Sequence, residues 1–289
     1  MGIGRDWSHY LLRPLADALL ARRSNSKALA RHALDFPGVL DAARCGADIA
    51  AAYGFEVDEA WMERFALGPA LDRQDVFSTL MGRSIVTEAR LAVAGRWPAG
   101  QFMALGLHWG AGFPVLGHLE ADGRHPAFVY RPENPDALDT LPRRLKNRLH
   151  MRALHGFGGC IPVGGAYQKI AATLSAGRVP VALFDAPAER DARTIDVHLD
   201  GYQVTLRTGL FRLLASQAVP YVFYRCGQNP AAEADGTVRL LEISSAAQSD
   251  DVEEIAQQAA AFLLDTLRHD AAQWHFWPHA DVLIRADGL

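Results

Sequence analysis

The spacing of hydrophobic residues divides the chain into two parts. Over residues 5–95 apolar side chains recur every three or four positions, as in HYLLRPLADALLARR (9–23), VLDAARCGADIAAAYG (39–54) and VFSTLMGRSIVTEARLAVAG (76–95). This spacing matches the turn of an α-helix, and proline and glycine mark the ends of the segments. We therefore expect a helical N-terminal part over residues 1–97.

The pattern changes after GRWPAG (95–100). Short apolar runs now alternate with helical segments of about a dozen residues. These runs are QFMALGLH (101–108), PAFVYR (126–131), VPVALF (179–184), VPYVFYR (219–225) and VRLLEIS (238–244). The alternation predicts an α/β domain over residues 98–289, with a mixed, mostly parallel sheet flanked by helices, and we expect it to form one compact unit with the helical part.

Two segments near the C-terminus have more specific patterns. IDVHLDGYQVTLR (195–207) has a DG pair between alternating runs, which predicts a β-hairpin. Residues 250–278 predict a long final helix that packs on the sheet, with Asp250 as its N-cap. The aromatic run WHFWPH (274–279) fits either an anchor at a membrane interface or a cap on the core.

Composition narrows the class of protein. The chain has 289 residues, 49% of them hydrophobic and 21% charged, so it is long enough to bury a large core. The formal net charge of −4 gives no overall attraction to nucleic acid, and we expect no nucleic-acid partner. Cys45, Cys160 and Cys226 lie far apart without C-x-x-C spacing, so we expect neither a disulfide framework nor a metal site.

The cysteines and the N-terminal residues predict the cellular compartment. Three isolated cysteines are typical of a reducing, cytoplasmic location. The first residues lack the pattern of a signal peptide, and no stretch approaches ~18 consecutive apolar residues. We expect a protein that is soluble or bound peripherally to a membrane.

His108 is the first candidate for chemistry. It follows the apolar run QFMALGL and precedes the small residues Gly110, Ala111 and Gly112. In open α/β sheets, functional groups lie at the carboxyl ends of strands. A lone histidine beside apolar residues is more often packed and hydrogen-bonded than catalytic, so both interpretations remain open at this point.

The order of several segments resembles that of a known superfamily. These segments are HWGAGF (108–113), VYRPENPDALD (129–139), a basic helix, GFGGCIPVGGAYQKIAATLSAGRVPVALFDAP (156–187) and LRTGLFRLLASQAVPYVFYR (206–225). Together they resemble the lysophospholipid acyltransferase superfamily, and within it the lauroyl and myristoyl transferases that act late in lipid A biosynthesis. The resemblance covers roughly residues 100–285.

The resemblance implies a reaction and a set of roles. An acyl chain would pass from the thioester of an acyl carrier protein or coenzyme A to a hydroxyl or amine of a lipid-like or small-molecule acceptor, with no permanently bound cofactor. His108 would act as general base, because an alcohol of pKa about 16 is a poor nucleophile at neutral pH. A carboxylate five residues after the histidine would orient the ring. The location would be cytoplasmic, extending to the cytoplasmic face of the inner membrane.

The chain departs from the family pattern at the carboxylate. Phe113 stands five residues after His108, and Gly164 and Gly165 stand where the family often has an arginine. Three interpretations follow. Asp185 of LFDAP supplies the orienting carboxylate, His108 works without one, or the protein only binds acyl groups or a carrier. A thioesterase that uses water as the acceptor is a further alternative.

Other candidate residues would contact the substrates. Gly110 and Phe113 follow the histidine in the resembling segment. Arg131 and Asn134 of YRPEN would pair with a phosphate or carboxylate of the acceptor, or form a local turn. The backbone amides around Gly164 and Gly165, before a helix that starts near Tyr167, would hold an oxyanion or a phosphate. Cys160 is either a nucleophile paired with His108 or an inert, packed thiol.

TLPRRLKNRLHMRALHG (140–156) predicts a basic amphipathic helix. Leu141, Leu145 and Leu149 recur every four residues. The basic residues are Arg143, Arg144, Lys146, Arg148 and Arg152. Such a helix would dock on an acidic acyl carrier protein or on anionic lipid headgroups, or would simply present a solvated face.

Overall fold

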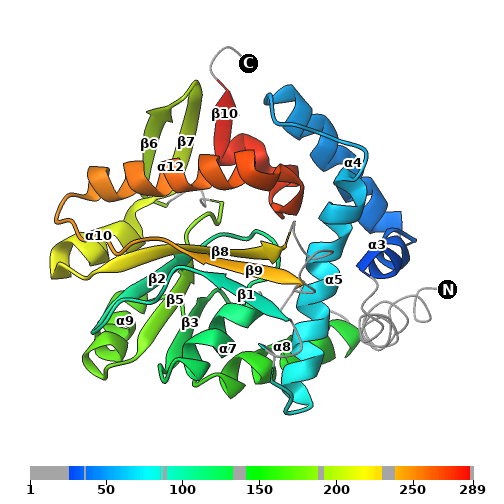
Figure 1. Cartoon of the computed structure of the whole chain (residues 1–289). Coiled ribbons are helices and arrows are strands. Elements are labelled where there is room, and N and C mark those ends of the chain that lie inside the picture. Colours follow the sequence, from blue (N-terminus) through cyan, green and yellow to red (C-terminus); the bar gives the residue numbers. More distant parts are fainter. Residues whose placement is uncertain are drawn as a thin grey trace.

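A seven-stranded sheet forms the centre of the protein in the computed structural model (Figure 1). The structure describes residues 26–35, 37–84, 86, 90–132, 141–187, 192–229 and 238–286. The predicted helix over 9–23 and the candidate residue Asn134 lie outside these ranges.

The strand order of the main sheet is β1-β9-β8-β2-β5-β3-β4. The bounds are β1 Leu91–Ala94, β2 Met103–Gly106, β3 Pro126–Tyr130, β4 Cys160–Pro162, β5 Val179–Leu183, β8 Tyr221–Gln228 and β9 Arg239–Ile243. Only the pair β8 and β9 is antiparallel, while the other neighbours run parallel. This arrangement confirms the predicted mixed, mostly parallel sheet.

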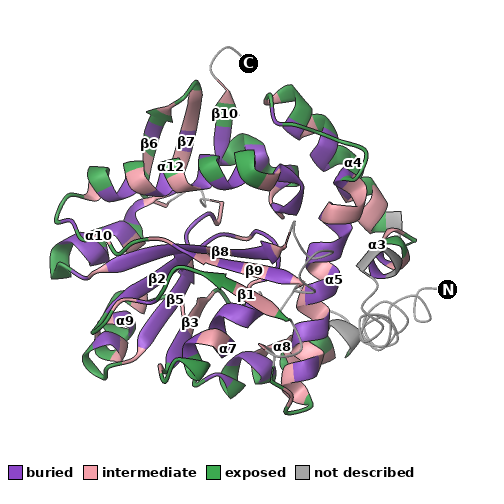
Figure 2. Cartoon of the chain, in the orientation of Figure 1, coloured by how far each residue is buried: buried purple, intermediate pink, exposed green. Residues whose placement is uncertain are grey.

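Helices cover both faces of the sheet, which explains its continuous apolar strands (Figure 2). One face packs against α9 (Ala166–Ser175), α10 (Thr208–Gln217) and α12 (Val252–Asp270), and the other against α7 (Phe113–Ala121) and α8 (Leu141–Gly156). All four residues of β2 are buried. The carboxyl end of β2 is therefore held by packing on both sides.

The DG pair forms the predicted hairpin of β6 (Thr194–Leu199) and β7 (Tyr202–Arg207). Asp200 and Gly201 have φ angles of 54° and 81°, as a two-residue hairpin turn with the twist of the strands requires. The hairpin does not join the main sheet. It forms a second sheet with β10 (Ile284–Ala286), and α12 runs between the two sheets (Figure 1).

Helices fill most of the described N-terminal part, with one exception. They are α3 (Ser26–Leu34), α4 (Pro37–Ala52) and α5 (Trp61–Leu80). The helical prediction is wrong for Leu91–Ala94, which forms β1 and pairs in register with Arg239–Glu242. A run of four apolar residues fits the period of a helix as well as that of a strand. Here β9 offers backbone hydrogen-bonding partners, so the segment forms a strand. Residues before position 97 thus contribute to the main sheet.

The C-terminal segment also corrects two expectations. The N-cap of α12 is Asp251 rather than Asp250, because the Asp251 carboxylate accepts a hydrogen bond from the Glu253 backbone amide at 2.8 Å. Trp274 and Trp277 are fully buried, so the interpretation as an interfacial anchor is wrong and these rings belong to the core. Among the helices that the structure describes, none has the length and apolar character needed to cross a bilayer.

Candidate active site

His108 and Asp185 meet at the carboxyl edge of the main sheet. β2 and β5 are parallel neighbours, and Gly106 pairs with Leu183. Continuing this register by two residues on each strand brings His108 opposite Asp185, 77 positions later in the chain. Parallel pairing therefore joins two residues that the sequence keeps far apart.

Asp185 holds both the ring and the backbone of His108. The His108 Nδ1 atom lies 2.8 Å from Asp185 Oδ1, and the His108 backbone amide donates to the two carboxylate oxygens at 3.1 and 2.9 Å. A carboxylate accepts hydrogen bonds, so Nδ1 carries the proton and the Nε2 lone pair remains available. Asp185 is completely buried, whereas the His108 side chain is 32% exposed.

Three residues of the C-terminal segment complete the surroundings of this pair. The Trp274 Nε1 atom donates to Asp185 Oδ2 at 2.9 Å, and the His275 backbone amide donates to the His108 carbonyl at 2.9 Å. The Phe276 ring lies 4.4 Å from the His108 ring, measured between centroids. Sequence reasoning missed these contacts, although the aromatic run WHFWPH was the visible signal.

Half-buried His275 supports the loop after His108. Its Nε2 atom lies 2.9 Å from the Gly110 carbonyl oxygen. Burial, followed by the nearby His108, lowers the pKa of His275 to about 4, so the ring is neutral at physiological pH. Nε2 must then carry the proton and donate to Gly110, which fixes the tautomer of His275.

Gly110 allows the loop of residues 107–112, which we call the histidine loop, to lie directly on β8. Gly110 has a φ of 64°, and a Cβ atom there would lie 2.4 Å from the Cys226 carbonyl oxygen. The Gly110 amide already donates to the Gln273 carbonyl at 2.9 Å. This residue was a substrate-binding candidate, but its amide is used within the protein, and its contacts are those of a close-packed turn.

Phe113 is the first residue of α7, and its ring packs in the core rather than against His108. It is 7% exposed and contacts the rings of His150 and Phe157 in the core between α7 and α8. Burial, followed by the charge of Lys146, lowers the pKa of His150 to about 4, so this neighbour is neutral as well. An apolar side chain suits this position, and the carboxylate comes from β5 instead.

The remaining substrate-binding candidates lie farther along the same edge. Arg131 follows β3 and Gly164 follows β4, two and three strands from β2, or about 10 and 14 Å at ordinary strand spacing. Gly165 has a φ of 67° and caps α9, which begins at Ala166 as predicted near Tyr167. These residues can contact an extended substrate but not the His108 ring itself.

Cys160 does not pair with His108. It lies in β4, separated from β2 by β5 and β3. Burial raises the pKa of its thiol to about 11, which leaves little thiolate at neutral pH. The interpretation as a nucleophile activated by His108 is wrong, and Cys160 is a packed thiol.

The basic helix is present as α8. Its residues Arg144, Lys146, Arg148 and Arg152 are exposed, while Ala153 and Leu154 are buried. Leu141 is 64% exposed, so the apolar stripe starts one turn later than predicted. The side chain of Arg143 lies outside the described part.

A buried charged cluster lies beneath the turn that follows His108. Asp75 of α5 forms an ion pair with Arg239 of β9, and both side chains are almost completely buried. The Asp72 carboxylate accepts a hydrogen bond from the Gly112 amide at the start of α7. Burial and the nearby Asp75 raise the pKa of Asp72 to about 7.

Replacing Asp72 with asparagine is expected to stabilise the protein above neutral pH. A carboxyl with a folded pKa above its unfolded value of about 3.9 binds its proton more tightly in the folded state, so its stabilisation is lost as pH rises through about 7. Asparagine keeps an acceptor for Gly112 without the charge. At about pH 8 we expect Tm to rise by about 2–4 °C, with a smaller difference at about pH 5. An equal Tm difference at both pH values would contradict this assignment.

Comparisons with known proteins assign no family. No protein-family model matches the chain, and the search of curated proteins finds no match. Among solved structures, the chain is similar to the 1-acyl-sn-glycerophosphate (LPA) acyltransferase PlsC from Thermotoga maritima, with a TM-score of 0.36 and 12% sequence identity. The match covers 82% of this chain and 96% of that chain.

Proposed function

We propose that this protein transfers an acyl chain from a thioester to a hydroxyl or amine, with His108 as general base and Asp185 as the carboxylate that orients it. The observation that carries the proposal is the 2.8 Å contact from His108 Nδ1 to the buried Asp185, which leaves Nε2 free on a partly exposed ring. This contact supports a base with a fixed tautomer and weakens the alternatives in which the histidine has no partner.

Each step of the reaction has a group to perform it. His108 Nε2 takes the proton of the acceptor hydroxyl while the hydroxyl oxygen attacks the thioester carbonyl carbon. Asp185 stabilises the imidazolium that forms. The tetrahedral intermediate then collapses, the carbon–sulfur bond breaks, and the thiolate takes the proton back from Nε2. The balance is complete without a permanently bound cofactor.

The carboxyl edge of the sheet is the proposed path of the substrates. Arg131 is exposed and follows β3, about 10 Å from β2. At that distance it would pair with a phosphate or carboxylate of an extended acceptor whose hydroxyl lies at His108. The amides at Gly164 and Gly165, before α9, offer a second polar contact farther along. The thioester would come from acyl carrier protein or acyl coenzyme A, and a cytoplasmic location with peripheral contact to an anionic membrane fits both.

We propose the exposed basic face of α8 as the docking surface for acyl carrier protein, whose surface is acidic. Reversing the charge of Arg148 and Arg152 to glutamate should raise KM for acyl carrier protein substrates by about 10-fold, with kcat unchanged, because rim charges act on encounter. Arg44→Glu, on the exposed side of α4, is the matched control. KM values that respond equally to both changes would rule out α8 as the docking surface.

The proposed reaction is tested by following the thiol and the acyl chain separately. Purified protein is incubated with lauroyl-coenzyme A or lauroyl acyl carrier protein, together with 1-acyl-sn-glycerol 3-phosphate and an amine acceptor as probes. Release of the thiol with an equal amount of acylated acceptor supports the proposal. Release with free laurate alone identifies a thioesterase. Binding of the acyl donor without release identifies a non-catalytic acyl-binding protein and overturns the proposal.

A further inference from the structure

The segment that starts at the last residue of α12 lies along the loop after His108 like a short strand. This strap, residues 270–277, includes the 3₁₀-helix η3 (Ala271–Gln273) and ends at the start of η4 (Trp277–Val282). Trp109 and Trp274 form an antiparallel bridge. The Gly110 amide donates to the Gln273 carbonyl and the His275 amide donates to the His108 carbonyl, both at 2.9 Å. The strap therefore sets the backbone position on either side of the bridge.

Trp274 contacts the carboxylate that orients the base. Its Nε1 atom donates to Asp185 Oδ2 at 2.9 Å, while the His108 ring contacts Oδ1. The two side chains thus use different oxygens of one buried carboxylate. Indole nitrogen can only donate, so this contact fixes which edge of Asp185 remains for His108.

The Trp274 ring cannot turn away from this contact. It is fully buried and packs edge-on against Trp277, with ring centroids 5.0 Å apart. Trp277 is itself fixed, because its Nε1 atom donates to the Ala271 carbonyl at 2.7 Å. The indole is therefore held between its hydrogen bond to Asp185 and the fixed ring of Trp277.

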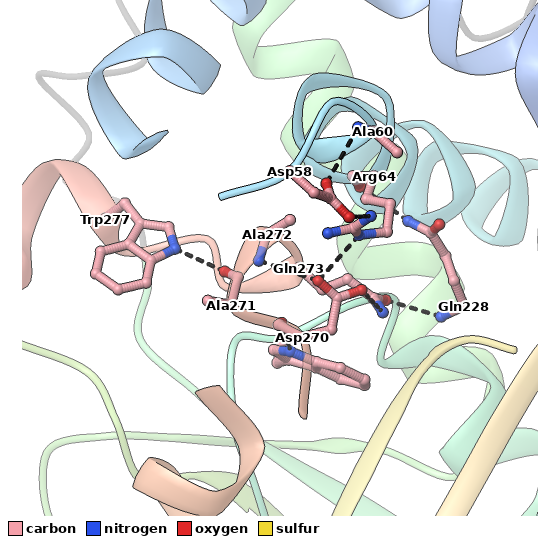
Figure 3. A network of polar contacts seen from close by, with 10 residues as sticks. Asp58, Ala60, Arg64, Gln228, Asp270, Ala271, Ala272, Gln273 and Trp277 are labelled. Atoms are coloured by element: carbon pink, nitrogen blue, oxygen red, sulfur yellow. Dashed lines mark hydrogen bonds and ion pairs between the residues drawn. The ribbon is translucent and has the colours of Figure 1, made fainter. Parts of the chain in front are cut away.

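A polar network anchors the start of the strap to α5 and β8 (Figure 3). Asp270 Oδ1 accepts from Arg64 Nε at 3.1 Å, and Asp270 Oδ2 accepts from Gln273 Nε2 at 2.9 Å. Gln273 Oε1 accepts from the Gln228 backbone amide at 2.8 Å, and Arg64 is paired on its other side with Asp58 at 2.8 Å. Asp270 and Gln273 of the strap are thus held by contacts that do not involve the His108–Asp185 pair.

We infer that Trp274 is a positioning residue for this pair, which rests on the proposed function of His108 as a base. By holding Asp185 Oδ2, the indole directs Oδ1 toward His108 Nδ1 and so keeps the proton on Nδ1 and the lone pair on Nε2. The orientation of the His108 ring would thus depend on Asp185, which contacts the ring, and on Trp274, which contacts Asp185.

The test is the ring tautomer of His108 in the Trp274→Phe protein, measured by nitrogen-15 NMR at a pH where titration finds the ring neutral. The wild-type protein should show the Nδ1–H tautomer, and Trp274→Phe should show a substantial Nε2–H population. Trp61→Phe is the matched control, because Trp61 is also fully buried and also loses one indole hydrogen bond, to the Ala43 carbonyl. The control should keep the wild-type tautomer.

Kinetics provide the second readout. With lauroyl-coenzyme A and the acceptor that the wild-type enzyme uses, Trp274→Phe should lower kcat about 10–100-fold, as is usual for a group that orients a catalytic side chain, and leave KM within about twofold. Trp61→Phe should change neither constant beyond about twofold. Equal tautomers and equal rates in the two variants would overturn the inference.

Failure of the proposed function and failure of the Trp274→Phe variant to fold can each be told apart from failure of the inference. If wild-type protein transfers no acyl chain, the proposed function fails, while the tautomer comparison still decides whether Trp274 orients the pair. If Trp274→Phe does not fold, the indole N–H resonance of Trp274 in the wild-type protein is followed as His108 titrates. A shift that tracks the titration, with no matching shift of the Trp61 indole, supports the inference, and an unchanged Trp274 resonance overturns it.

Discussion

Replacing Asp185 with asparagine is expected to lower kcat for acyl transfer by about 10³–10⁴-fold, with little change in KM. The Trp274 indole requires an acceptor, so the asparagine oxygen turns toward it and the amide NH₂ group faces His108 Nδ1. That arrangement favours the tautomer with the proton on Nε2, which can no longer act as a base. Steady-state kinetics on folded variants measure the loss.

The two members of the pair are expected to act as one unit. His108→Ala should lower kcat by about 10²–10⁴-fold, and the His108→Ala, Asp185→Asn double variant should be no slower than the slower single variant. His198→Ala, on the exposed side of β6, controls for the loss of a histidine. Additive losses, or a His108→Ala enzyme that keeps most of its activity, would show that the pair does not perform the chemistry.

Replacing Arg239 with methionine is expected to reduce the free energy of unfolding by about 3–5 kcal/mol at neutral pH. Arg239 is 1% exposed and forms a buried ion pair with Asp75, and its charge also lowers the pKa of Asp72. Without the guanidinium, the Asp72 and Asp75 carboxylates keep their mutual repulsion and lose the attraction of the buried Arg239 charge. Urea unfolding at about pH 7.5 measures the loss.

A second substitution separates the charge from the packing. Asp75→Asn combined with Arg239→Met removes both charges of the pair, and we expect it to recover at least about half of the loss, because no unpaired Asp75 charge remains. The loss in Arg239→Met alone should also shrink near pH 5, since protonation neutralises carboxyls whose pKa is raised. A double variant that is less stable than Arg239→Met would contradict the charge explanation.

The Asp75–Arg239 pair also matters for the site. Asp72 lies one helical turn before Asp75 on α5 and contacts the Gly112 amide, four residues after His108. The cluster thus links α5, β9 and the start of α7 beneath the histidine loop. None of this was visible in the sequence, because isolated acids and arginines in amphipathic segments are ordinarily exposed.

The sequence by itself determined the classes of element and the position of His108 after a strand. Alternating apolar runs predicted the covered sheet, the DG pair predicted the hairpin, and the small residues after His108 predicted a strand end, because these features depend on local backbone geometry and side-chain period. The prediction from hydrophobic period was wrong at Leu91–Ala94. Four apolar residues fit a helix or a strand, and pairing with β9 makes this segment a strand.

Only the tertiary structure decided which residues surround the histidine. The register of β2 and β5 brings Asp185 against the His108 ring, and the strap supplies Trp274 from far along the chain. Strand order likewise separates Cys160 from His108. Sequence spacing describes neighbours along one element, whereas the contacts of this site arise from the pairing of different elements, which depends on the packing of the whole core.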